Sequence, residues 1–419
     1  MSEVKVSNIA ERVAGIGKQK QGIVLLSLLQ IFAVTILLRT FLPLFITRAI
    51  GALILFSVIY YSTSYLNKRT LFVFLSVAVF FSLNFLFSSD RMVALRDTVY
   101  FTSAVLLANL FCNSGFRESF LLQLKKNRLS NELVLFLCNA VLLIGFFDTN
   151  AYRIAWGGHE YFQGYAGGTH PIANASCLVI VFALIKIQMT GISLLGLAYF
   201  AIPTYAILMS GARTFLIAPV IILWLIYKNC NSKGFVKHLF IILGILAFVF
   251  LLLNSSTFLK FDFLLTRGQQ NYSNLGVADS ITNDRITLWT ENLIEFASGN
   301  WLQIIFGRCF DFVFRFNRDF TIGAEIWSHN DIINLLLSIG LFGTFVYIWI
   351  LHDFFKNTFR NNSGKLSKML FVVYIVFPMM LNGFYAYQAY MFGAIMMSSV
   401  AFRKDLNMQT VDADIWKLA

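Results

Sequence analysis

Charged residues are scarce in this sequence: Asp, Glu, Lys and Arg make up 13% of its 419 residues. A soluble chain usually carries about 25%, so the composition argues against a soluble protein. The cysteines are few and scattered, and no CxxC or Cys/His pair has the spacing of metal ligands. The sequence therefore predicts neither a structural metal nor a disulfide framework.

Several catalytic and transport signatures are also missing. There is no GxxxxGK[ST] phosphate loop, no GxSxG elbow and no HExxH helix. The predicted outer loops contain no DxD-like cluster for a metal-bound nucleotide sugar. Asp and Glu are rare in the apolar runs, so a proton-coupled transporter would lack its usual relay. The basic residues form no continuous patch with aromatics, which argues against nucleic-acid binding. No cofactor is predicted.

Apolar residues dominate instead: 58% of the chain is hydrophobic, 45 residues are Phe, and the mean hydropathy is +0.70. Runs of roughly 17–20 apolar residues recur, the length a helix needs to cross a ~30 Å hydrocarbon core. They do not alternate as barrel strands do. We predict an all-α, polytopic transmembrane helical bundle. Its twelve spans are expected near 22–38, 49–65, 70–87, 98–113, 132–148, 172–187, 191–209, 214–228, 237–254, 330–351, 368–384 and 386–402.

Polar segments divide the chain around these spans. The predicted parts are an N-terminal tail (1–21), spans 1–9 (22–254), a large loop (255–329), spans 10–12 (330–402) and a C-terminal tail (403–419). A shorter polar segment covers 149–171. The first tail is polar and no small-residue cleavage site follows it, so no cleaved signal peptide is expected.

Lysine and arginine set the predicted orientation, because short cytoplasmic loops are enriched in both. With the N-terminus inside, the inside segments hold 21 of the 33 Lys and Arg residues. Both termini are therefore expected in the cytoplasm, and both polar segments on the outer face. Spans 6, 8 and 10 then begin at that outer face, where helix N-termini favour anions.

Two of these span starts carry candidate catalytic residues. Arg213 opens span 8, where a cation is unfavourable unless a bound anion or a carboxylate side chain neutralises it. The alternative is an arginine at the membrane interface that extends its guanidinium to the lipid headgroups. Ser328 is a plausible N-cap for span 10, which would put His329 in the first turn. There the helix dipole keeps imidazole neutral, so His329 could act as a general base. An interfacial histidine without a role is the alternative.

The large loop contains a predicted amphipathic helix, capped by Asn283 or Asp284. Its apolar residues at helical spacing are Ile286, Trp289, Leu293 and Phe296. Arg285 lies in its first turn, and pairing with Asp284 or Glu291 is the structural alternative to a catalytic role.

Other polar residues are candidates for substrate binding. His170 opens span 6 after two glycines that permit close approach to a ligand, although a flexible joint is an equally good interpretation. Asn330 follows His329. Arg308 and Arg315 add positive charge to the large loop. Arg39, Arg48 and Arg153 could line the same cavity or lie at the membrane interface.

Three of these elements together resemble a known family. His329-Asn330, followed after nine residues by Gly340-Leu341-Phe342-Gly343, resembles the H-N-x9-G-x-x-G signature of bacterial O-antigen ligases and Wzy-type O-antigen polymerases. Residues 210–214 (SGART) resemble the arginine element of that family, and Asp284-Arg285 resembles the start of its loop helix. The resemblance covers roughly residues 165–350 and also implies a GT-C-like fold.

The resemblance implies a glycosyltransferase that needs neither a metal nor a nucleotide sugar. Such enzymes transfer a glycan from undecaprenyl pyrophosphate to an acceptor hydroxyl at the periplasmic face of the bacterial inner membrane. Arg213 and Arg285 would stabilise the departing pyrophosphate, and His329 would take the acceptor proton. We favour an O-antigen or capsule polymerase, which could work with a chain-length regulator protein. An O-antigen ligase acting on lipid A–core is the alternative, and a polysaccharide or lipid exporter without catalysis is the alternative of another class.

Overall fold

The computed structural model describes residues 22–229, 234–270, 279, 282, 284–320, 326–359 and 364–400. Helices make up most of these ranges, which confirms a mainly α-helical protein. The helices before the hairpin are α2 (Ile23–Leu37), α3 (Leu44–Thr63), α4 (Lys68–Phe87), α5 (Arg91–Phe111), α6 (Ser114–Lys126), α7 (Arg128–Phe147) and η1 (Thr149–Ala151). Those around and after it are η2 (Trp156–Gly158), η3 (Gly164–Ala166), α8 (Thr169–Thr190), α9 (Leu194–Ser210), η4 (Arg213–Leu216), α10 (Ile217–Asn229), α11 (Gly234–Leu253), α12 (Ser256–Gln270), α14 (Arg285–Ala297), α15 (Trp301–Phe306), α16 (Phe310–Phe320), α17 (Asp331–Thr358), α18 (Lys365–Leu381) and α19 (Gln388–Met397).

Several helices are long and apolar enough to cross a membrane. In the described ranges these are α3, α4, α7, α8 and α17, and two bent pairs raise the number from 5 to as many as 7. Each of the twelve predicted spans overlaps a helix. Some of those helices are short, however: α10 has 13 residues and α19 has 10, whereas a straight crossing takes about 20.

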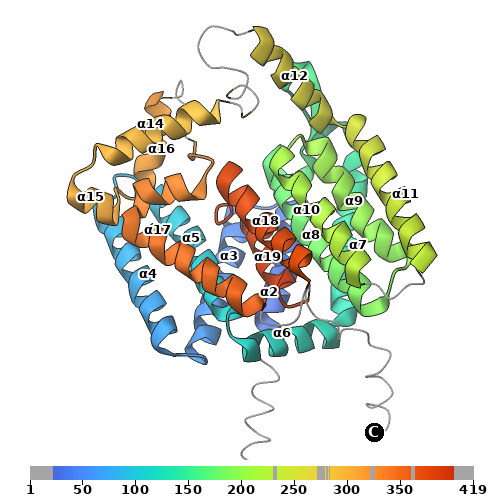
Figure 1. Cartoon of the computed structure of the whole chain (residues 1–419), viewed down its shortest axis with the longest axis horizontal. Helices are drawn as coiled ribbons and strands as arrows, with labels where there is room; N and C mark the ends of the chain where they lie inside the picture. Colours follow the sequence, from blue (N-terminus) through green and yellow to red (C-terminus); the bar gives the residue numbers. More distant parts are fainter. Residues whose placement is uncertain are drawn as a thin grey trace, which may run out of the picture.

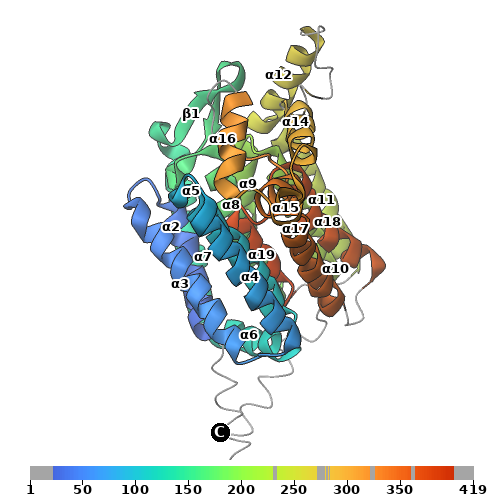
Figure 2. The same cartoon turned by 90° about the vertical axis from the view of Figure 1, so that its left-hand side faces the viewer.

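The bundle is built around α8. In α8, 94% of the most apolar window is buried, against 33% in α3 and in α4. Helices α9 and α19 pack directly on α8, and α3 and α4 lie at the edge of the bundle (Figures 1 and 2). The edge helices turn large apolar side chains such as Phe56, Leu75 and Phe85 outward. That pattern suits contact with lipid rather than water.

The two polar segments meet at one end of the bundle. Figure 2 shows β1, α12, α14 and α16 at that end and α6 at the opposite end. Strands β1 (Tyr152–Ala155) and β2 (His159–Phe162) form an antiparallel hairpin, in which Tyr152 pairs with Phe162. Ser256 of α12 donates a 2.8 Å hydrogen bond to the Glu160 carbonyl, and Thr257 donates one of 2.6 Å to the Leu208 carbonyl. These bonds fix the start of the large loop against the hairpin and α9.

The glycines of the GxxG element have a packing role. Gly340 interrupts α17 with φ +67°, a conformation that side chains other than glycine rarely adopt. The break frees the Leu337 and Ser338 carbonyls, which accept hydrogen bonds from the Arg308 and Cys309 amides at 2.7 and 2.9 Å. A Cβ on Gly340 would overlap the Ile305 carbonyl. The segment after α15 can therefore lie directly against α17.

The start of α14 differs from the prediction. The helix begins at Arg285, but Asp284 adopts φ +62° and makes no side-chain cap bond, and Asn283 lies outside the described residues. The cap comes from Asp279, whose Oδ1 accepts hydrogen bonds from the Ile286 and Thr287 amides at 2.9 and 3.2 Å. A carboxylate several residues upstream thus satisfies the free amides of the first turn.

Candidate functional site

His329 lies in a short segment without regular secondary structure, residues 326–330, just before α17. The predicted N-cap at Ser328 is wrong: Asn330 is the N-cap, and its Oδ1 accepts hydrogen bonds from the Ile332 and Ile333 amides. His329 is therefore outside the first turn, with φ +52°. An unfavourable backbone conformation of this kind persists only where neighbouring contacts hold it.

Those neighbouring contacts come from the large loop. Trp289 of α14 donates a 2.6 Å hydrogen bond from Nε1 to the Ser328 carbonyl. The buried Ser328 hydroxyl donates to Asn292 Oδ1 at 2.9 Å. Asn317 of α16 then donates to the Ile326 carbonyl at 2.8 Å. The amphipathic helix α14 thus serves to position the segment that carries His329.

Asn382 is the hydrogen-bonding centre of the site. It ends α18, is fully buried, and lies in the turn before α19. Arg285 donates to Asn382 Oδ1 at 3.2 Å and to the Leu381 carbonyl. Asn382 Nδ2 lies 3.5 Å from Nδ1 of His170. His329 also hydrogen-bonds to Asn382. One amide therefore connects three of the predicted site residues.

Asp331 fixes the turn that carries Asn382. Its buried Oδ2 accepts hydrogen bonds from the Phe384 amide (2.9 Å), the Tyr385 amide (3.1 Å) and the Tyr347 hydroxyl (2.9 Å). Asp331 is the first residue of α17, directly after the Asn330 cap. The two ends of the site, around His329 and around Asn382, are thereby held to each other.

Arg213 and Lys260 add two further cations to the site, from η4 and α12. Arg213 begins η4, two residues after Gly211, which is the C-cap of α9 and has φ +71°. Lys260 of α12 is buried and places Nζ 3.3 Å from the centre of the Trp156 ring. Arg213, Lys260, Arg285 and His329 all act electrostatically on His170. The structure therefore brings together Arg213, Arg285, His329 and His170, and adds Lys260; we call these five residues the His–Arg cluster.

Burial and like charge determine the protonation of the cluster. Removal from water and, to a smaller extent, the Arg285 charge lower the pKa of His329 to about 3, while hydrogen bonds to Asn382 oppose the shift. Burial likewise lowers the pKa of Arg285 to about 10, and it lowers the pKa of Arg213. His329 is thus a neutral imidazole at neutral pH, although for a different reason from the helix dipole expected from the sequence.

The cluster is suited to bind an anion and accept a proton. Neither Lys260 nor Arg285 forms an ion pair with a carboxylate in the described part of the chain. Buried cations that repel one another are stabilised by a bound anion. Nδ1 of His329 is buried and has no hydrogen-bond partner among the described residues. The His170, Arg213, Arg285 and His329 side chains all remain partly exposed, so a ligand can reach them.

A cavity of about 540 Å³ adjoins the cluster. We call it the Tyr100 cavity, and its lining residues include Arg39, Arg48, Arg96, Tyr100, Trp327 and Tyr387. Trp327 lies two residues before His329, and the Tyr387 ring is 6.0 Å from the His170 ring. Two of the three arginines expected from the sequence thus line one cavity, whereas Arg153 lies exposed on β1.

The remaining predicted binding residues make other contacts. Arg308 pairs with Glu295 and lies 4.9 Å from the centre of the Phe312 ring. Arg315 pairs with Asp311 at 3.3 Å. Neither is among the groups that act on His170 or His329. Asn330 serves as the α17 cap. These contacts stabilise the loop, and a substrate-binding role for these residues stays a prediction.

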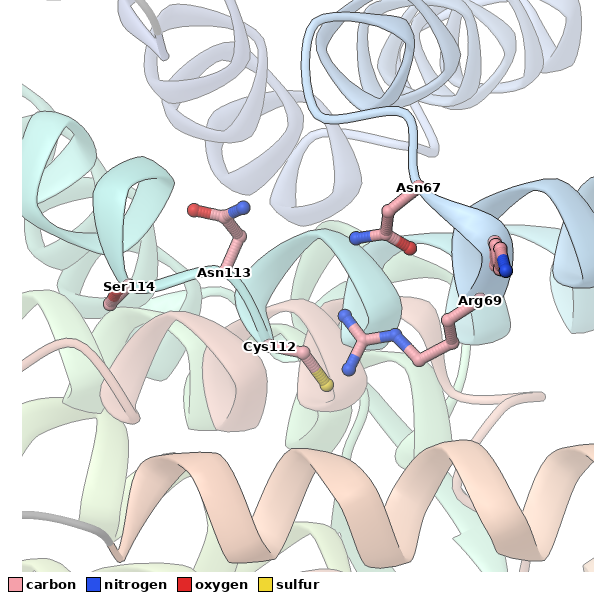
Figure 3. A pocket seen from close by; sticks show the side chains of 6 residues that line it. Asn67, Arg69, Cys112, Asn113 and Ser114 are labelled. Carbon is pink, nitrogen blue, oxygen red and sulfur yellow. The ribbon is translucent and has the colours of Figure 1, made fainter.

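A second cavity, of about 520 Å³, lies beside the start of α6, at the other end of the bundle. Figure 3 shows the Arg69 side chain reaching toward Cys112 in this cavity. Two of its polar side chains already have protein partners: Arg69 pairs with Asp353 at 3.6 Å, and Asn113 Oδ1 accepts a hydrogen bond from the Gly115 amide at 2.9 Å. We therefore place the candidate site at the His–Arg cluster.

Sequence reasoning did not identify Lys260 or Asn382. Lys260 lies in a helix that follows an apolar run, where a lysine is typical of a membrane interface. Asn382 ends an apolar helix and matches no motif. Their role depends on contacts between residues more than 90 positions apart, such as Arg285 with Asn382. The one local signal for Asn382 was its place near the end of predicted span 368–384, next to Gly383.

Comparison with known proteins identified no relative. No family model matches the chain, and neither a curated protein nor a solved structure is similar to it.

Proposed function

We propose that the protein is a glycosyltransferase that polymerises O-antigen or capsule repeat units carried on undecaprenyl pyrophosphate. The observation that carries this proposal is the His–Arg cluster, in which a neutral His329 lies among Arg213, Lys260 and Arg285. This combination suits a reaction that releases a diphosphate and deprotonates a hydroxyl. We also propose that the chain belongs to the family that its motifs resemble and forms a GT-C-like bundle of twelve spans. In this proposal the protein lies in the inner membrane, with both termini in the cytoplasm and the active site on the periplasmic side.

The proposed reaction assigns a task to each charged group. His329 takes the proton of an acceptor sugar hydroxyl while that oxygen bonds to the anomeric carbon of the donor. The bond from that carbon to the diphosphate oxygen breaks, and the diphosphate leaves with the electron pair. Arg213 and Arg285 stabilise the charge that develops on it, because permanent cations already in position need little reorganisation.

Bound diphosphate would also strengthen the base. The Arg285 charge contributes to the low pKa of His329, and an anion on Arg285 offsets that contribution. The pKa of His329 then rises toward its ordinary value of about 6.5. His329 becomes a better proton acceptor when the donor is in place.

A deletion strain and a His329→Ala strain test this proposal together. Loss of a polymerase leaves single repeat units attached to core, whereas loss of a ligase leaves long chains on the lipid carrier. We expect the deletion to give single units and His329→Ala to lower polymer synthesis by about 10²–10⁴-fold. A normal ladder of chain lengths in His329→Ala would contradict the base role. Retention of untranslocated units inside the cell would instead indicate an exporter.

A further inference from the structure

The Tyr100 cavity contains a second group of cations. Arg39, Arg48 and Arg96 all act electrostatically on Tyr100. Arg39 and Arg48 form no ion pair with any carboxylate that the structure describes. Arg96 forms two hydrogen bonds with Asp97, at 2.8 and 3.2 Å. Asp97 offsets one of the three charges, so the group retains a net positive charge that a bound anion would balance.

Most of the remaining cavity wall is apolar, although Thr47, Asn174 and Gln388 also line it. The apolar part comes mainly from α2, α3 and α5, through residues that include Phe32, Ile36, Leu44, Ala52 and Val99. Helix α3 lies at the edge of the bundle, with only 33% of its apolar window buried. The ligand that matches both surfaces has an anionic head and a hydrocarbon chain. The volume of about 540 Å³ is typical of small-ligand sites and suits a diphosphate with a few isoprenoid units.

Tyr387 separates this group from the His–Arg cluster. Its ring lines the cavity on one side and contacts the Phe215 ring on the other, at 5.1 Å between centres. The arginines of the cavity come from α5 and from the ends of α2 and α3, whereas those of the cluster come from η4 and α14. The two cation groups are therefore built by different elements and can bind two anions side by side.

We infer that the Tyr100 cavity binds the diphosphate and first isoprenoid units of a second lipid-linked glycan, the acceptor. This inference rests on the proposed polymerase function, in which donor and acceptor are both linked to a lipid diphosphate. The chain of the acceptor lies along α2, α3 and α5, and its diphosphate bonds to Arg39, Arg48 and Arg96. Its sugar then extends past Trp327 toward His329.

Binding of labelled farnesyl diphosphate to the full chain tests the inference. The protein is held in nanodiscs of phosphatidylcholine, and equilibrium dialysis gives the number of sites and their Kd. We expect two sites in the parent protein. Arg39→Gln/Arg48→Gln should weaken one site by roughly 10–100-fold, because each arginine contributes charge-assisted hydrogen bonds. Ala52→Trp, which fills the cavity without a charge change, should weaken the same site. Arg153→Gln is the matched control and should keep two sites.

The outcomes separate this inference from the proposed function. Two unchanged sites in both Arg39→Gln/Arg48→Gln and Ala52→Trp would overturn it. The inference would also be overturned if phosphatidylglycerol displaced farnesyl diphosphate from the cavity as well as unlabelled farnesyl diphosphate does. The cavity would then be a general lipid site. Arg213→Gln/Arg285→Gln should weaken only the other site. If that variant keeps both sites and full polymer synthesis, the proposed function fails while the cavity still binds a diphosphate.

Discussion

His329 and Arg285 show how two residues depend on each other through charge. Burial and the Arg285 cation lower the pKa of His329 to about 3, so the imidazole is neutral over the whole physiological range. A base with so low a pKa is weak by Brønsted behaviour. The pair works well only if the ligand that Arg285 binds also raises the basicity of His329.

This dependence predicts different pH profiles for the free and the loaded enzyme. Protonation inactivates a base, so activity falls as the pH drops below its pKa. In free enzyme that pKa is about 3, and kcat/KM should show no His329 limb above pH ~4. In the loaded enzyme the pKa is higher, and kcat should fall at a higher pH. Steady-state profiles with a lipid-linked donor measure both quantities, and coincident acid limbs would contradict the coupling.

Lys260 should bind the anion without taking part in proton transfer. Its Nζ lies over the Trp156 ring, and the residue acts on His170 together with Arg213 and Arg285. We expect Lys260→Gln to raise KM or the donor Kd roughly 10-fold, the effect of about 1.4 kcal/mol. Burial lowers the pKa of Lys260 to about 7, so the variant should lose any dependence of anion binding on pH near 7. The acid limb that belongs to His329 should persist, because His329 is unchanged. Arg153→Gln is the control for a lost charge at the same end, and an unaltered Kd in Lys260→Gln would refute the assignment.

At the scale of the elements, α15 and α17 depend on a glycine contact. Gly340→Ala places a Cβ against the Ile305 carbonyl and forces alanine into φ +67°. We expect a loss of about 2–4 kcal/mol of stability, seen as a lower melting temperature in detergent. Gly244→Ala is the matched control in α11, because the nearest atoms to its new Cβ lie at an ordinary 3.8 Å. An unchanged Gly340→Ala protein would mean that α17 can straighten.

Hydropathy alone predicted most helices, because burial in lipid requires long apolar runs. It missed α6, whose 13 residues include Arg117, Lys125 and Lys126, since an amphipathic helix on a surface has no such run. It also missed the β1–β2 hairpin, whose strands have four residues each. The α14 helix was predicted from its apolar spacing, but its cap was not, because Asp279 reaches the first turn from outside the local pattern.

Sequence reasoning proposed several of the residues that the structure brings together, and their catalytic roles stay predictions. Arg213, Arg285 and His329 were proposed from their places at helix starts and from the family resemblance. Asn382 connects Arg285, His329 and His170 through hydrogen bonds between distant parts of the chain, and no local pattern encodes such a contact. Tertiary contacts also explain why His329 is neutral: desolvation, and not the helix dipole, is the main cause of its low pKa, since the residue lies outside the first turn of α17.

At the scale of the whole molecule, the two ends of the bundle differ in charge and structure. The hairpin, α12 and α14 lie at one end, and α6, with its lysines in the last turn, lies at the other (Figure 2). Lys260 and Arg285 of the His–Arg cluster belong to α12 and α14. Cytoplasmic surfaces of membrane proteins are rich in lysine and arginine. The α6 end should therefore face the cytoplasm and the hairpin end the periplasm.

Single cysteines report this orientation directly. Cys112, Cys138, Cys177 and Cys309 are buried and should react slowly, and Cys230→Ser removes the remaining thiol. In that background, Arg153→Cys on β1 should react with a membrane-impermeant maleimide in right-side-out vesicles. Lys126→Cys at the end of α6 should react only after permeabilisation, because the bilayer blocks the reagent. Inverted vesicles should reverse the two results. Labelling of Lys126→Cys in sealed right-side-out vesicles would put the His–Arg cluster in the cytoplasm, where a periplasmic polymerase could not work.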